Sequence, residues 1–122
     1  MNGGKETITR DDLLYRRFVA YHIKPDGRLS SAVFMRRKKI DPALSVDLAR
    51  LTTPQKTQAP YPHMGVAEIA ASVPLDMGLA IEHSPDLEND NYAHCLIIGL
   101  ESKSQCRRMA EESKILLEPG HI

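Results

Sequence analysis

Apolar and polar residues alternate in two runs, at residues 18–24 and 29–35, on either side of Pro25, Asp26 and Gly27. Alternation of this kind, with many β-branched and aromatic residues, is typical of strands. Proline presets the first dihedral of a turn, and Gly27 tolerates the positive φ that closes a short hairpin. The pattern therefore predicts a β-hairpin, whose register stays open because both of its faces carry apolar residues.

Two helix-start signals precede and follow the apolar run at residues 44–51. Asp11 and Asp12 favour a short helical turn over residues 13–15, because acids near a helix start satisfy free N–H groups. Thr53 and Pro54 predict a brief helix, since threonine caps a helix and proline suits its first position. Residues 44–51 themselves fit a strand and a helical turn equally well.

The second half of the chain predicts three more strands, over residues 65–71, 79–83 and 93–100, with a helical turn over 74–78. Ser102 and Gln105 have the spacing of a capping box and predict the start of a last helix that Pro119 and Gly120 end. One side of this helix is apolar, with Cys106, Met109, Ala110, Leu116 and Leu117. The whole pattern predicts an α+β fold, in which a small mixed or antiparallel sheet of about four to five strands is covered by a C-terminal amphipathic helix.

The length and composition are those of one globular domain. The chain has 122 residues, of which 42% are hydrophobic and 26% are charged. We expect a flexible N-terminal tail over residues 1–9 and a single α+β domain over residues 10–122. No apolar run is long enough to span a membrane, and the N-terminus has no apolar stretch typical of a secretory signal. These features predict a cytoplasmic protein with no membrane partner.

Charge is distributed unevenly along the chain, although the formal net charge is zero. Residues 1–40 hold ten Lys and Arg against four Asp and Glu, whereas residues 41–122 hold six against twelve. The two halves of opposite sign either face each other within the fold or present separate surfaces to partners. The sequence leaves both arrangements open.

The basic half supplies the candidate binding residues. Segment 15–39, which contains the predicted hairpin, interleaves cations with Tyr15, Phe18 and Tyr21. Arg and Lys neutralise phosphates or pair with acidic side chains, and Tyr stacks on bases. Because dedicated nucleic-acid-binding domains are strongly basic and this chain is neutral, an acidic protein partner is favoured. The candidate residues for a partner or a nucleic acid are Arg16, Arg17, Arg28, Arg36, Arg37, Lys38 and Lys39.

Ser31, Asp47 and His94 supply the residue types of a nucleophile, an orienting acid and a base, and they are the catalytic candidates. No Gly-x-Ser-x-Gly motif accompanies them. Cys95 follows His94 directly, but adjacent residues on a strand point to opposite faces, so this pair is poorly placed to exchange a proton. Cys95 and Cys106 are instead predicted as small core residues.

The metal candidates are Asp86 and Glu101. Pro85-Asp86 and Glu101-Ser102-Lys103 resemble the acidic elements of a nuclease superfamily, in which two acids hold Mg²⁺. The second element usually lies within a strand in that superfamily, whereas here the pattern places it at the start of the last helix. The histidines at positions 63, 83 and 94 lie on different predicted segments without a ligating spacing. The favoured interpretation has neither a metal nor a cofactor.

Four runs, KPDGRLSSAVF, LSVDLARLTTP, GVAEI and NYAHCLIIG, occur in this order within residues 14–117. Their pattern resembles a group of short bacterial proteins that share the turn, the Ser-Ser-Ala-x-Phe run, the Ser-Val-Asp run and an Asn-x-Ala-His run. The group has no established activity, so the resemblance implies a bacterial origin and a grouping without a function. The positions to which it points are Ser30, Ser31, Phe34, Ser45, Asp47, Asn91 and His94.

The favoured function is that of a small intracellular binding module without enzymatic activity. Its basic N-terminal half and acidic C-terminal half would engage a partner protein or a second copy of the chain. The first alternative is a nucleic-acid-binding module that uses the basic hairpin 15–39. The second is a small hydrolase or a metal-dependent nuclease.

Overall fold

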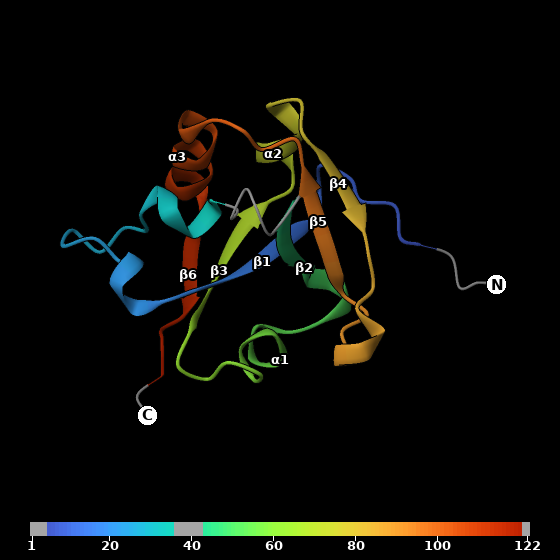
Figure 1. The fold of residues 1–122 in the computed structure, drawn as a ribbon, viewed down its shortest axis with the longest axis horizontal. Helices are drawn as coiled ribbons and strands as arrows, with labels where there is room; N and C mark the ends of the chain where they lie inside the picture. The colour runs from blue at the N-terminus through green and yellow to red at the C-terminus, as the bar shows by residue number, and fades with distance from the viewer. Residues whose placement is uncertain (1–4, 36–42, 121–122) are drawn as a thin grey trace.

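Six strands form one antiparallel sheet in the computed structural model, which describes residues 5–35 and 43–120 (Figure 1). The strand order is β4-β5-β2-β1-β3-β6, so the first strand of the chain lies inside the sheet. The strands are β1 Leu13–Phe18, β2 Leu44–Leu48, β3 Gly65–Ala70, β4 Ala80–His83, β5 His94–Ile98 and β6 Lys114–Leu117. The predicted α+β class is confirmed, with a larger sheet than the four to five strands expected.

Three short α-helices accompany the sheet: α1 Pro54–Gln58, α2 Ser72–Asp76 and α3 Lys103–Glu112. Thr53 caps α1 by accepting a hydrogen bond from the Lys56 N–H at 3.1 Å, as its sequence predicts. The capping box of α3 is also confirmed, because Ser102 Oγ accepts from the Gln105 N–H and Gln105 Oε1 accepts from the Ser102 N–H. No described helix is long and apolar enough to cross a membrane.

The predicted hairpin over residues 18–35 is wrong. The turn forms, with Gly27 at φ 86°, but only the bridge between Ile23 and Leu29 pairs its two sides. Short 3-10 turns, η1 Ala20–His22 and η2 Ser31–Phe34, replace the strands. Ser30 Oγ accepts from the Ala32 N–H at 3.0 Å, and such local bonds compete with a sheet ladder. The side chains of Val33 and Phe34 are thereby buried beneath α3 instead of alternating across a sheet.

The first strand of the sheet, β1, lies before the predicted hairpin, at Leu13–Phe18. A helical turn was predicted over residues 13–15 of this segment. Both edges of β1 find partners, since it pairs with β2 and with β3. This double pairing outweighs the weak local preference that Asp11 and Asp12 give to a helix start. Local signals alone do not reveal it, because the partners lie more than 25 residues further along the chain.

The last helix is shorter than predicted. It ends at Glu112, and the next residues form the edge strand β6, which pairs with β3 through Ile115 and Ala67. Leu116 and Leu117 therefore belong to a strand and not to the apolar side of α3. The open edge of β3 pairs with the backbone of this segment and holds it as a strand.

The remaining predicted elements are present with adjusted ends. Residues 44–51 divide into strand β2 and the 3-10 turn η3 Ala49–Leu51. The strands predicted over 65–71, 79–83 and 93–100 correspond to β3, β4 and β5. The helical turn expected to begin at Pro74 starts two residues earlier, and Gly78 follows it at φ 82°.

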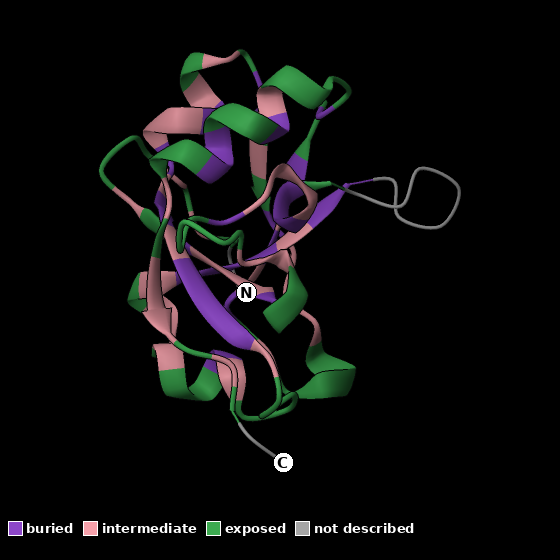
Figure 2. Ribbon diagram, turned by 90° about the vertical axis from the view of Figure 1, so that its left-hand side faces the viewer, coloured by how far each residue is buried: buried purple, intermediate pink, exposed green. Residues whose placement is uncertain are grey.

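The core lies between one face of the sheet and the layer of η2 and α3 (Figures 1 and 2). Alternate residues of the central strands point into it, and buried side chains of η2 and α3 cover them. The largest of these side chains are Leu14, Phe18, Phe34, Leu44, Leu48, Ile69, Ile97 and Met109. The other alternate positions of β2 and β5, including Ser45, Asp47 and His94, therefore face the opposite side, where α1 supplies Thr57.

Segment 5–12, part of which was expected to be a loose tail, contacts β4 and the turn η3. The Glu6 N–H donates to Nδ1 of the buried His83 at 2.8 Å, and Arg50 donates to the Thr7 carbonyl at 2.9 Å. Lys5 lies 3.7 Å from Glu82, and Arg50 also pairs with Glu6 and with Asp12. Several charges of the two halves of the chain therefore neutralise each other within the molecule.

The two cysteines are predicted to be unreactive in the native protein. Both are buried free thiols, and burial, with a smaller contribution from Asp47, raises the pKa of Cys95 to about 12. Burial also raises the pKa of Cys106. Because the thiolate is the reactive form, an aromatic disulfide reagent at pH 8 should modify the folded protein far more slowly than the unfolded protein. A thiol that reacts in buffer as fast as it does in 6 M guanidinium would contradict this packing.

Candidate functional site

The structure brings two of the three catalytic candidates together. Asp47 on β2 and His94 on β5 are register partners in neighbouring strands. Ser31 lies in η2, with α3 on the other face of the sheet, and does not share their environment. The sheet therefore separates Ser31 from the other two residues.

Ser45 takes the place beside His94 that was considered for Ser31. Its Oγ lies 3.1 Å from His94 Nε2, while His94 Nδ1 lies 2.7 Å from the Ser84 carbonyl oxygen. Ser45 and Asp47 are two residues apart on one strand, so both point to the same face. In the sequence, the signal for this serine is the Ser-x-Asp spacing, which places Ser45 and Asp47 on one face when the segment forms a strand.

Asp47 is a buried carboxylate with two donors from other segments. Thr57 Oγ1 of α1 donates to Oδ2 at 2.8 Å, and Asn91 Nδ2 donates to Oδ1 at 2.9 Å. A buried charge is tolerated when hydrogen bonds replace its hydration, and this pair supplies them. Ser45, Asp47, Asn91 and His94 thus gather at one place.

A small hollow of about 20 Å³ opens beside this cluster, which is room for roughly one water molecule. Tyr15 lines it from β1, and burial together with the nearby Glu68 carboxylate raises the Tyr15 pKa, so the phenol keeps its proton. The complete lining is Tyr15, Arg16, Arg17, Ser45, Val46, Asp47, Thr57 and His94. We call the polar residues of this lining, all of them except the core residue Val46, the polar cluster.

Two of the predicted binding cations are held by main-chain carbonyls of the protein itself. Arg16 donates to the Val33 carbonyl at 2.9 Å and to the Ser45 carbonyl at 2.8 Å. Arg17 donates to the Thr57 carbonyl at 3.0 Å, and its guanidinium carbon lies 4.8 Å from the centre of the Tyr61 ring. These contacts stabilise the polar cluster and the segment after α1. Four further candidates, Arg36, Arg37, Lys38 and Lys39, lie outside the described residues.

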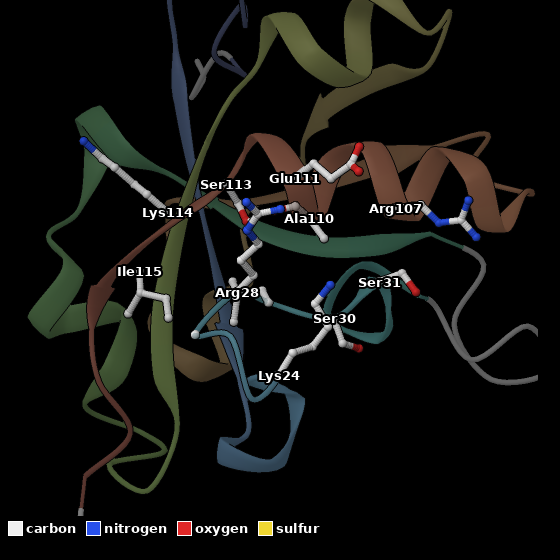
Figure 3. Close-up of a pocket in the computed structure, with 12 residues that line it drawn as sticks. Lys24, Arg28, Ser30, Ser31, Arg107, Ala110, Glu111, Ser113, Lys114 and Ile115 are labelled. Atoms are coloured by element: carbon white, nitrogen blue, oxygen red, sulfur yellow. The ribbon is translucent and has the colours of Figure 1, made fainter.

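The remaining binding candidate, Arg28, lines a hollow of about 690 Å³ between the turn at residues 24–31 and the end of α3 (Figure 3). Four cations and one acid border it: Lys24, Arg28, Arg107, Lys114 and Glu111. The other lining residues are Gly27, Leu29, Ser30, Ser31, Ala110, Ser113 and Ile115. We call this hollow the basic groove. It contains Ser31, so this serine lies among cations and away from His94.

Some of the groove's cations already have acidic neighbours. Lys114 lies 3.4 Å from Glu68, and Arg28 lies 4.0 Å from Asp26. Within the described part of the chain, Lys24 and Arg107 form no ion pair. The groove therefore keeps an excess of positive charge on an exposed surface.

The two metal candidates lie at opposite ends of β5. Asp86 precedes this strand and Glu101 follows it, and five strand residues span roughly 17 Å. Two carboxylates at this separation do not share one ion. In residues 5–35 and 43–120, no three His, Cys, Asp or Glu side chains are grouped as metal ligands.

Comparisons with known proteins give no relative: the chain matches no protein-family model, and no curated protein or solved structure is significantly similar to it. The geometry of the polar cluster and of the basic groove is therefore the basis on which a function is inferred.

Removing the Thr57 hydroxyl is predicted to destabilise the fold. Thr57→Val keeps the side-chain shape but deprives the buried Asp47 carboxylate of one donor, at a cost of about 1.5–3 kcal/mol. Urea unfolding at pH 7 measures this cost. Thr52→Val is the matched control, because the Thr52 hydroxyl makes only a long, exposed contact of 3.5 Å, and we expect a change within about 0.5 kcal/mol. Equal stabilities of the two variants would show that the Asp47 bond contributes nothing.

Proposed function

We propose that the protein is a binding module that holds an acidic segment of a protein partner in the basic groove. The groove itself catalyses no reaction in this proposal. The observation that carries the proposal is the concentration of four cations against one acid around a hollow of about 690 Å³. This volume lies within the roughly 300–1,000 Å³ of ordinary ligand pockets. The arginines are suited to carboxylates, because a guanidinium donates two parallel hydrogen bonds to one carboxylate.

A second copy of the chain offers a segment with the required chemistry. The loop around η4, Leu87–Asn89, carries Asp86, Glu88 and Asp90, and its Leu87 side chain is 75% exposed. This loop and the turn at residues 24–31 lie toward opposite ends of the molecule's long axis (Figure 1). Complementary charges at opposite ends favour a head-to-tail contact, in which the acidic loop of one copy enters the basic groove of the next.

The groove cations have a second role that the experiment must separate from binding. Lys114 lies two residues beyond the end of α3, where positive charge opposes the negative end of the helix dipole, whereas Arg107 lies in the middle of the helix. Substitution of Lys114 therefore lowers stability slightly as well as removing charge from the groove. Binding and unfolding are measured on the same variants for this reason.

Charge reversal in the groove is predicted to weaken binding of the acidic loop. A fluorescent peptide of residues 84–93 should bind the protein at 50 mM salt, and Arg28→Glu with Arg107→Glu should weaken it by roughly tenfold or more. The matched control is Lys56→Glu with Lys103→Glu, which makes the same charge change at exposed positions outside the groove lining and should leave affinity unchanged. Anisotropy measures affinity, and raising the salt to 500 mM should weaken it further.

Three outcomes contradict this function. The first is binding that both double variants lose equally, which would reflect net charge and not the groove. The second is equal binding of a peptide in which Asn and Gln replace the acids. The third is binding of a DNA or RNA oligonucleotide through Arg28 and Arg107 where the peptide does not bind, which would assign the groove to nucleic acid.

A further inference from the structure

We infer that Ser45 and His94 form an acyl-transfer site, with Ser45 as the nucleophile toward small esters. The site lies on the sheet face opposite to the basic groove, shares no residue with it and is independent of the proposed binding function. The hydrogen bonds of the His94 imidazole support this site.

The contacts of His94 determine which of its nitrogens carries the proton. The Ser84 carbonyl oxygen, 2.7 Å from Nδ1, accepts hydrogen bonds and cannot donate one, so Nδ1 carries the hydrogen. In the neutral ring, Nε2 then presents its lone pair to Ser45 Oγ at 3.1 Å. The serine hydroxyl donates to this lone pair, which is the arrangement in which a histidine removes a serine proton.

Main-chain pairing holds both reacting side chains in place. The Ser84 N–H donates to the His94 carbonyl at 2.9 Å, while the Ser84 carbonyl orients the imidazole, so two bonds join these residues. Arg16 is a positioning residue, because it donates to the Ser45 carbonyl and so fixes the backbone of the nucleophile. A backbone carbonyl has the orienting role that an aspartate has in a Ser-His-Asp triad.

The surroundings favour the charges that form during the reaction. Asp47, the register partner of His94, carries a negative charge that stabilises the imidazolium created by proton transfer. Arg17 lines the same hollow and supplies positive charge for the oxyanion. Since the hollow has room for only about one water molecule, the ester approaches from the surface, where Ser45 and His94 are both partly exposed.

The proposed reaction consumes an ester and water. Ser45 Oγ attacks the acyl carbon while His94 Nε2 takes the serine proton. The bond between the acyl carbon and the leaving oxygen then breaks, and that oxygen receives the proton from His94. Water then attacks the acyl group on Ser45, and His94 takes a proton from the water and returns it to Ser45 Oγ. The products are a carboxylic acid and an alcohol, and no oxidant or reductant is needed.

A fluorophosphonate probe and p-nitrophenyl acetate test this inference. The probe should form a phosphorus–oxygen bond at Ser45 with loss of fluoride, located by peptide mass mapping. Ser45→Ala should remove this label, and His94→Gln should slow both labelling and ester hydrolysis by roughly 100-fold. Ser104→Ala is the control, because Ser104 is exposed and lies outside both sites, and it should react like the unsubstituted protein.

The inference is overturned by labelling of Ser45 no faster than of Ser104, or by ester hydrolysis at the wild-type rate in Ser45→Ala. It is also overturned if His94→Gln, shown to be folded by circular dichroism, reacts at the wild-type rate, because the imidazole would then be structural only. Neither result affects peptide binding in the basic groove, so the two proposals fail separately.

Discussion

The buried Asp47 carboxylate is the constraint around which the second face of the sheet is built. A buried charge is stable only while it accepts hydrogen bonds, and the donors to Asp47 come from α1 and from the loop before β5. Asp47 thereby joins β2 to α1, ten residues further along the chain, and to the loop before β5, 44 residues further along. The same strand and the same face carry Ser45, so the bonds that hold Asp47 also fix the geometry between Ser45 and His94.

One strand, β2, serves two different environments because its side chains alternate. Leu44, Val46 and Leu48 enter the core beneath α3, whereas Ser45 and Asp47 belong to the polar cluster. The basic groove forms on the α3 side, where the turn at residues 24–31 meets the helix end. A single sheet thus separates a surface suited to binding from a site suited to proton transfer.

The features that the sequence predicted well depend on neighbouring residues. Thr53 and Ser102 cap helices through bonds within three residues, and β3 and β5 have strong local strand patterns. The errors concern pairing over distance. The helix-like start at Asp11 yields to a strand because β1 has two distant partners, and Leu117 joins β6 because β3 has an open edge. The contact between His94 and Ser45, 49 residues apart, has no local signal beyond the alternation of β2.

The strand order has a consequence for how the chain folds. Within the described sheet, the pairs β1–β2 and β4–β5 join consecutive strands, whereas the pairs β2–β5, β1–β3 and β3–β6 join strands that have at least one further strand between them in the sequence. Loop closure must precede each of these pairings, so the ladder contacts bring little stability until distant segments have met. β6 completes the edge of β3 only after residue 114 is available. During synthesis the open β3 edge is therefore exposed until residues 114–117 emerge, and folding is expected to be slow.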